Sequence, residues 1–456
     1  MADFDIPPDR FKRVLRTRDV LALSFGAMIG WSWVLFTGHW VLSAGSIGTL
    51  LAFSAGGAVI LFIGLTYAEL AAAMPKAGGE HVYTRVALGP AWSFVCTWAL
   101  LMAYATVCVF ESVALPTAIE YLFPSIRLAT LWTVLGAPVS AGFVAIGIVA
   151  ALVMTWINVI GIRAAALVQS VITATVLGAG VLLIVGAASF GSLANTEPPI
   201  AIPATGILTV LIMVPAMMVG FDVLPQSAEE INLPPRRIGW LLVLSLLMAV
   251  LWYGAISFAV SMALDPKELA STSMATADAA TSLWHGSWAG TVLIVGGIGG
   301  ILTSWNAFII GGSRVMFALS ESGFLPASFS RLHPKYKTPY IGVCVLGLMA
   351  SISPFFGRTI LVWLVDTGSF AVVIAYIFVP VAFLVLRRKQ PDLARPFRVR
   401  YPSLVGVIAV VLGLVLLSFY FPWSPSSLIW PYEWGIALGW ALLGLVCWLF
   451  RDSRTN

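Results

Sequence analysis

Charged side chains are scarce in this sequence. Only 10% of its 456 residues are Asp, Glu, Lys or Arg, whereas soluble domains carry about 25%. Apolar residues make up 60% of the chain. This composition excludes an ordinary soluble protein. The net charge of +5 does not indicate a nucleic-acid partner, because the basic residues are placed in short connections between apolar runs.

Cysteine and histidine are also rare, with four residues of each. The cysteines lie inside apolar runs without paired spacing, and the histidines are scattered, so we expect neither disulfides nor a metal site. The sequence has no cluster of His, Cys or Asp and no nucleophile motif. We therefore expect no metal, no cofactor and no enzymatic activity. The cysteines are Cys96, Cys108, Cys344 and Cys447.

Long apolar runs are abundant. About 20 apolar residues in a helix span the hydrocarbon core of a bilayer, and a helix satisfies its own backbone hydrogen bonds there. The runs predict an all-α membrane protein with twelve transmembrane helices. These are residues 20–43, 47–73, 91–122, 136–156, 164–188, 206–231, 239–263, 289–319, 340–355, 359–386, 404–421 and 433–450.

The basic residues indicate how this bundle is oriented. With a cytoplasmic N-terminus, 22 of the 25 lysines and arginines fall in cytoplasmic segments, and only Arg127, Lys267 and Arg358 fall outside them. Cytoplasmic loops of membrane proteins are enriched in basic residues. We therefore predict a multi-pass protein of the plasma membrane (the inner membrane in a bacterium), with both termini in the cytoplasm.

Two predicted helices contain residues that interrupt helices. The first has Gly26 and Gly30, and the sixth has Pro215, Gly220 and Pro225. Proline removes a backbone donor, and glycine weakens a helix. Because five spans separate the breaks, the two helices enter the membrane from opposite faces. This placement predicts an inverted five-helix repeat with two discontinuous helices meeting at the midplane; simple helix kinks are the alternative.

Six segments have distinctive sequences: YAELAAAMPKAGGEHVY at 67–83, NVIGIR at 158–163, GFD at 220–222, AEE at 228–230, SRVMFALSESGFLP at 313–326 and RRKQPDLARPF at 387–397. They resemble the amino acid–polyamine–organocation superfamily of permeases. The resemblance covers nearly the whole chain and implies a leucine-transporter-like fold of two inverted five-helix repeats plus two peripheral helices. It divides the chain into a cytoplasmic N-terminal segment (1–19), a first repeat (20–190), a second repeat (204–390), peripheral helices eleven and twelve (404–450) and a cytoplasmic tail (451–456).

The first break is the main candidate for a substrate site. An unwound helix leaves backbone N–H groups free, which favours an anion such as a carboxylate. The superfamily pattern resembles Ile-Gly-Ser/Thr-Gly-Ile; this chain has Ile29 and Gly30, but Ser32 stands where the second glycine usually lies. Glycine gives the closest approach to a backbone, so this departure leaves carboxylate binding open and adds a hydroxyl. We expect Gly26, Ala27, Ile29, Gly30 and Ser32 to bind the substrate.

Carboxyl groups inside the predicted helices are further candidates. A charge within the membrane is costly and usually marks a pathway. Asp222 lies beside the second break with Gly220 and Phe221, and Glu111 lies past the middle of the third span. Alternatively, Asp222 only organises the unwound backbone, and Glu111 is reached by water from the outer surface. Trp305 is an aromatic candidate, because aromatic faces hold cations or gate a pathway.

Arg163 is a candidate coupling residue, together with Asp222. Many members of the superfamily carry lysine at the position of Arg163. A buried lysine can lose its proton, whereas arginine stays charged. If Arg163 lies where sodium binds in distant relatives, its fixed charge predicts transport without sodium. The alternative is a loop arginine whose head group reaches water.

Together, these features predict a secondary active transporter, a permease that moves an amino acid by alternating access. The alternatives are an amine permease of the ethanolamine or polyamine type, favoured by Ser32 and by the two acids, and an amino acid exchanger. The expected partners are a small amino acid or amine and the lipid bilayer, and coupling to protons is left open. Broken helices in inverted positions favour a carrier over a channel.

Overall fold

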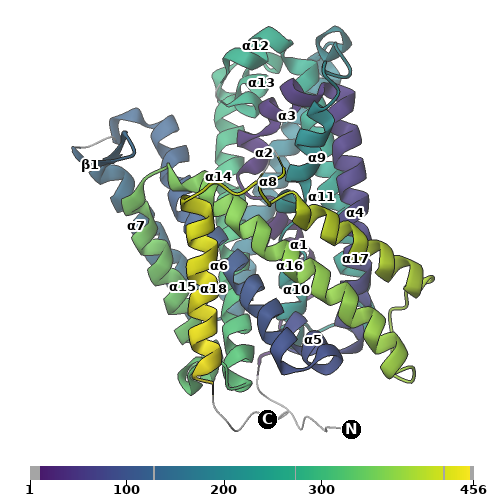
Figure 1. The fold of residues 1–456 in the computed structure, drawn as a ribbon. Helices are drawn as coiled ribbons and strands as arrows, with labels where there is room; N and C mark the ends of the chain where they lie inside the picture. Colours follow the sequence, from purple (N-terminus) through teal and green to yellow (C-terminus); the bar gives the residue numbers. More distant parts are fainter. Residues whose placement is uncertain (1–10, 127–128, 273, 425–426, 452–456) are drawn as a thin grey trace.

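The polypeptide folds into a bundle of long helices (Figure 1). The computed structural model describes residues 11–126, 129–272, 274–424 and 427–451, so parts of both predicted terminal segments lie outside it. Within these residues, eight helices are long and apolar enough to cross a membrane, and further apolar helices are shorter. The long helices are α4 (Ser46–Ala73), α6 (Pro90–Leu122), α7 (Ala141–Val159), α8 (Ile162–Phe190), α11 (Pro235–Ala263), α14 (Ser287–Glu321), α16 (Ile360–Lys389) and α18 (Tyr432–Leu449), and the shorter ones are α9 (Gly206–Met217), α15 (Tyr340–Ile352) and α17 (Pro402–Ser418).

Glycine and proline predicted breaks in the first and sixth helices, and both breaks are present. The first consists of α1 (Thr17–Met28), α2 (Ser32–Leu35) and α3 (Thr37–Ala44). In the sixth, α9 is followed by α10 (Val223–Gln226) and a short 3-10 turn. The chain is therefore a helical membrane protein with two broken helices, while the count of twelve spans and the inverted repeat stay predictions.

The two breaks lie against each other. A methyl group at Gly220 would lie 2.7 Å from the Ala27 side chain and 2.9 Å from the Met28 nitrogen. The φ angle of Gly220 is +130°, which other residues rarely adopt. Only glycine therefore lets the second break pack directly on the first.

Part of the fourth predicted helix forms a hairpin instead. The prediction began that helix at residue 136, but β1 (Thr130–Val134) and β2 (Ala137–Ser140) form an antiparallel pair, and α7 begins at Ala141. Leu135 and Gly136 form the turn at positive φ, and Pro138 lies in β2. Apolar composition concealed the hairpin, because a strand and a helix can share it. The connections also contain α5 (Glu80–Leu88), α12 (Pro266–Ser271) and α13 (Ala275–Leu283).

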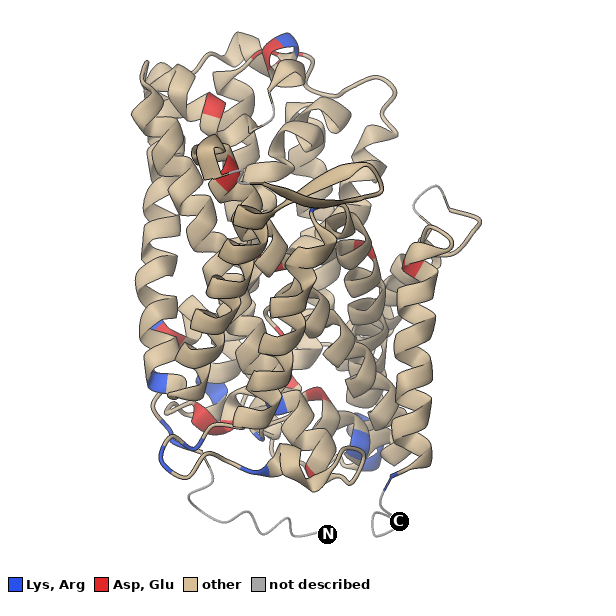
Figure 2. Cartoon of the chain, turned by 90° about the vertical axis from the view of Figure 1, so that its left-hand side faces the viewer, with Lys and Arg blue, Asp and Glu red and all other residues tan. Residues whose placement is uncertain are grey.

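Basic residues gather at one end of the bundle, the end that carries α5, as Figures 1 and 2 show. We call it the basic end. Buried ion pairs join elements there. Arg314 of α14 bonds both carboxylate oxygens of Glu230, at 2.8 and 3.1 Å. Glu69 of α4 pairs with Arg387 at 2.5 Å and with Arg395 at 3.2 Å.

Candidate functional site

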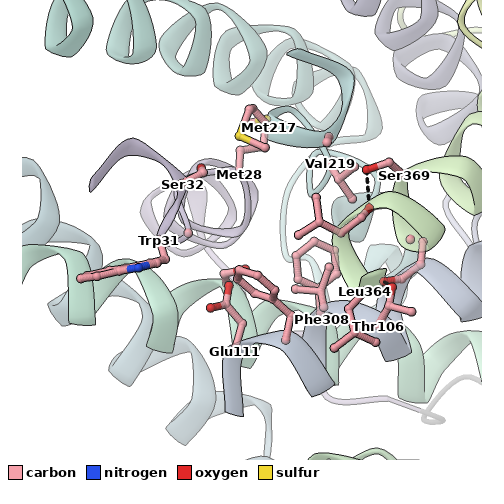
Figure 3. Close-up of a pocket in the computed structure, with 18 of the residues that line it drawn as sticks. Met28, Trp31, Ser32, Thr106, Glu111, Met217, Val219, Phe308, Leu364 and Ser369 are labelled. Carbon is pink, nitrogen blue, oxygen red and sulfur yellow. Dashed lines mark hydrogen bonds between the residues drawn. The ribbon is translucent and has the colours of Figure 1, made fainter. Parts of the chain in front are cut away.

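A cavity of about 90 Å³ lies beside the first break. We call it the central cavity; its walls come from the first break, α6, the end of α9, α14 and α16. Trp31 and Glu111 lie on one side of this space, and Thr106, Leu364 and Ser369 lie on the other (Figure 3). Its volume is far below the ~300–1,000 Å³ of pockets for drug-sized ligands, so it suits a small solute.

The first break offers backbone donors to this cavity. Gly30, Trp31 and Ser32 line it, and their N–H groups have no hydrogen-bond partner among the described residues. The preceding N–H, of Ile29, still donates to the Phe25 carbonyl at 3.1 Å. Unpaired donors are costly inside a protein. An anionic group of a solute would satisfy them.

Glu111 of α6 lies beside the same donors. A methyl group at Gly30 would be 3.0 Å from the Glu111 Oε1 atom. The side chain is 2% exposed and lies, like Ser304, beside Gly30. Its Oε2 atom has no partner within the described part of the chain. A buried carboxyl group without a counter-ion needs a cation or a proton, so the cavity provides for both an anion and a cation.

Ser32 adds an oxygen to this set. The Tyr253 hydroxyl donates to the Met28 carbonyl at 2.8 Å and lies 2.8 Å from the Ser32 hydroxyl. Because Tyr253 has one proton to donate, Ser32 donates to Tyr253. The Ser32 hydroxyl can then only accept from a solute, whereas its backbone N–H can donate.

The acid of the second break is satisfied within the protein. Asp222 is fully buried and accepts hydrogen bonds from the Gly220 N–H at 2.7 Å and from the Tyr104 hydroxyl at 2.8 Å. Phe221 packs between the rings of Tyr67 and Tyr376, at 5.2 and 5.3 Å. None of the three residues Gly220, Phe221 and Asp222 lines the central cavity.

Behind the second break, Glu80 of α5 is completely buried. Gln226 of α10 donates a hydrogen bond to its carboxyl group. Burial, and then the charge of Asp222, raise the pKa of Glu80 well above its usual value. The carboxyl group therefore keeps its proton more readily than an exposed glutamate would.

The predicted binding residues fall into two groups. Ala27, Gly30, Ser32 and Glu111 line the central cavity. The others do not: Gly26, Ile29, Gly220, Phe221, Asp222 and Trp305. Direct contact of this second group with a solute stays a prediction.

Two of these positions have clear local reasons. A methyl group at Gly26 would meet Gln169 and Thr173 of α8, so this glycine allows helix packing. Trp305 is buried, but Ser304 and Phe308 supply the cavity wall of α14. Successive residues of a helix are about 100° apart, so Trp305 lies off that face.

Arg163 is exposed at the start of α8 and does not line the central cavity. A network of neutral amides lies deeper along α8. Asn306 of α14 accepts from Asn158 at 2.9 Å and donates to Gln169 at 2.8 Å, and Gln169 donates to the Ala22 carbonyl of α1 at 3.1 Å. Neutral amides therefore link α1, α8 and α14 here, while the neighbouring Ser170 of α8 donates to the Asp19 carboxylate of α1 at 3.3 Å.

Sequence reasoning missed most of the apolar wall. On α6, the lining residues around Glu111 repeat every three or four positions, which is one helical face. The same spacing recurs on α16. Extending the helical period from Glu111 would have found the first set. The two sets are Ala103, Thr106, Val107 and Phe110, and Leu364, Val365, Gly368 and Ser369.

Comparisons with known proteins find similarity to transporters along most of this chain. A family model described as amino acid permease matches residues 15–446. The branched-chain amino acid permease BcaP of Bacillus subtilis (strain 168) is 27% identical over 455 residues, which cover 97% of this chain and 94% of that protein. The methylthioribose transporter of the same organism is 24% identical, covering 90% and 88%. Cationic amino acid transporter 4 of Mus musculus is 27% identical, covering 84% of this chain and 62% of that protein.

Proposed function

We propose, because the chain belongs to the amino acid permease family, that it is a secondary active transporter that moves an amino acid across the plasma membrane by alternating access. Family membership and the apolar helices make it an integral membrane transporter rather than an enzyme.

The proposed architecture has twelve spans. Eight long apolar helices, three shorter ones, and the broken helix formed by α1, α2 and α3 supply them. The contact between Gly220 and Ala27 supports an inverted repeat, because such repeats bring two broken helices together at the substrate site. In this arrangement α17 and α18 are the peripheral helices.

The observation that carries the substrate proposal is the pairing of free donors with an acid. The N–H groups of Gly30, Trp31 and Ser32 can bind a carboxylate, and Glu111 beside them can bind an ammonium group. An α-amino acid carries both groups on neighbouring atoms. A zwitterion would therefore satisfy both features at once within a small cavity.

An amine permease is the second candidate. Glu111 places a negative charge close to the donors, which weakens binding of a carboxylate unless the acid keeps its proton. Ser32 also offers only its backbone N–H to an anion. One relative is named for methylthioribose, so similar chains are not confined to amino acids. An amino acid exchanger stays open as well.

Uptake into proteoliposomes distinguishes these candidates. The probes are leucine and lysine, each paired with the amine left by its decarboxylation, and empty liposomes serve as the control. Saturable uptake of an amino acid, with the matching amine excluded, supports the carboxylate site. Uptake of the amine alone supports the amine permease, and uptake of none of the four contradicts both readings of the cavity.

The coupling of solute transport to an ion is tested with the same vesicles. Glu111 and Asp222 are the buried acids at the two breaks and are our candidates to carry a proton. We propose that transport needs no sodium, because neutral amides link α1, α8 and α14 where Gln169 packs against Gly26. Equal uptake in sodium and choline buffers, and faster uptake under an inward proton gradient, are the expected results. A saturable sodium requirement would reject this proposal.

The orientation is proposed from the charge distribution. The basic end, with both chain termini, faces the cytoplasm, because basic segments stay on that side. Lys337 is exposed in the segment after α14, and Lys267 is exposed on α12. In a variant without native cysteines, a membrane-impermeant thiol reagent on whole cells should label a cysteine at 267 and miss one at 337. Labelling in the reverse order would invert the topology.

A further inference from the structure

A second cavity adjoins the central one. It has a volume of about 350 Å³, and we call it the lateral cavity. One face of α9, α16, the end of α17 and residues 427–429 surround it. Both cavities share the wall residues Ala216, Met217, Val365 and Ser369. A single layer of side chains therefore separates the two spaces.

The lateral cavity is lined by a carboxyl group that sequence reasoning missed. Asp366 lies in the second turn of α16 and lines the cavity. Trp363 and Phe370, on either side of it, pack on Tyr432 and Trp434 of α18, which flank Glu433, so the two carboxyl groups are neighbours. Two neighbouring buried carboxyl groups repel each other when both are ionised, so one of them keeps a proton. The pair then carries one negative charge.

This charge is not neutralised by the rest of the described chain. Glu433 is fully buried and accepts the Ile429 N–H at 2.6 Å, but its Oε1 atom has no donor. Neither Asp366 nor Glu433 forms an ion pair with a lysine or arginine of the described residues. A buried charge without a partner is strongly unfavourable. The site therefore favours a bound cation.

Aromatic rings around the acids narrow the type of cation. Phe419 and Tyr420 line the cavity. The Phe370 ring lies 5.8 Å from Tyr420 and 6.0 Å from Trp434. Aromatic faces attract organic ammonium groups, whereas small metal ions need a shell of oxygen ligands. The largely apolar walls of this cavity fit the organic cation.

We propose that the lateral cavity is a second binding site, selective for an organic ammonium group, in which a solute is held before it passes Met217 into the central cavity. The passage into the central cavity rests on the proposed transport function. Binding at the Asp366–Glu433 pair does not, and it can be measured on purified protein.

The test is calorimetric titration of the full-length protein in detergent with 3-methylbutylamine and with 3-methylbutanol, which has a similar shape and no charge. The amine should bind, and the alcohol should bind at least tenfold more weakly, because the alcohol cannot pair with the acids. Titrations with sodium and potassium chloride should show no saturable binding. Equal binding of amine and alcohol, or binding of the metal ions alone, would overturn the proposal.

Variants assign the binding to this cavity. Asp366→Asn and Glu433→Gln should each weaken amine binding roughly tenfold to a hundredfold, as expected for loss of a charged hydrogen-bonding partner. Glu197→Gln, which removes an exposed carboxylate, is the control and should change nothing. In Glu111→Gln, which removes the acid of the central cavity, the lateral site should still bind the amine.

Loss of amine binding in Glu111→Gln, together with its retention in Asp366→Asn, would place the amine site in the central cavity and contradict the proposal. If Asp366→Asn does not fold, two other measurements still test the proposal. They are the comparison of amine and alcohol binding in the wild type and the amine binding of Glu433→Gln. Amine binding without any uptake in proteoliposomes would reject the transport function and leave the lateral site in place. Uptake of an amino acid without amine binding would support the transport function and reject the lateral site.

Discussion

The two helix breaks lie in contact, yet their acids differ: an oxygen of Glu111 has no partner among the described residues, whereas Asp222 is paired within the protein. At the first break, the N–H groups of Gly30, Trp31 and Ser32 and one oxygen of Glu111 are without partners among the described residues. At the second, Asp222 bonds Gly220 and Tyr104 within the protein. The first break borders the central cavity, and the acid of the second does not.

This difference separates a binding site from a support. Unpaired polar groups in a buried site cost free energy in the empty protein, and a ligand that pairs them recovers it. A satisfied acid gains little from a ligand, but it holds the backbone that carries it. We therefore propose that the first break binds the solute and that the second break fixes the shape of the first.

The largest expected effect comes from glycine at the contact between the breaks. Gly220→Ala places a methyl group within 2.9 Å of the Met28 backbone at a φ angle of +130°, so we expect a loss of stability of about 3 kcal/mol or more. Thermal unfolding in detergent measures it. Gly178→Ala on α8 is the matched control, because its methyl group meets nothing within 4 Å. Equal melting temperatures for the two variants would contradict the close contact.

Glu111→Gln is the sharpest test of the first break. The change keeps the shape of the side chain but removes its charge, so uptake of the transported solute should fall roughly tenfold to a hundredfold. The melting temperature should stay the same or rise, because a buried unpaired acid is removed. A fall in melting temperature with normal uptake would show that Glu111 is a support, as Asp222 is.

Asp222→Asn tests the second break. We expect the variant to lose about 1–3 kcal/mol of stability, because the bonds from Gly220 and Tyr104 lose their charged acceptor. Solute affinity, measured by titration, should change less than twofold. Tyr104→Phe should produce a smaller loss of stability, and the double variant should lose less than the sum. Normal stability with strongly reduced solute affinity would show that Asp222 takes part in binding the solute.

The sequence predicted the features that depend on local chemistry. Apolar runs placed the helices, and glycine and proline placed both breaks. Gly30, Ser32 and Glu111, which the sequence predicts to bind the substrate, line one cavity, because a break and a buried acid are visible without knowing the fold. Their contact with a substrate stays a prediction.

Features that depend on distant residues could not be read in the same way. Tyr104, the partner of Asp222, is 118 positions away, so the sequence could not show that this acid is satisfied. Asp366 was passed over because its partner, Glu433, lies on another helix. Trp305 was chosen by residue type, whereas the rotation of α14 presents Ser304 and Phe308 to the cavity.

The smallest expected effect is the pH dependence of the second break, and it comes from Glu80. Because burial raises the pKa of Glu80 above its usual value of 4.5, the folded protein holds this proton more tightly than the unfolded chain. The stability from this group is full below pH 4.5 and is lost as the pH rises through the folded pKa. The melting temperature of the wild type should therefore fall between pH 5 and pH 9.

Glu80→Gln tests this point, because the amide cannot ionise and can still accept the hydrogen bond from Gln226. Its melting temperature should fall less over the same pH range, with a difference on the order of 2 °C per pH unit, since one pKa unit is worth about 1.4 kcal/mol. Glu197→Gln at an exposed position controls for the loss of a carboxylate. Identical pH profiles for Glu80→Gln and the wild type would mean that Glu80 is ionised in the folded protein. The second break would then contain two negative charges, Glu80 and Asp222, and could no longer be treated as satisfied within the protein.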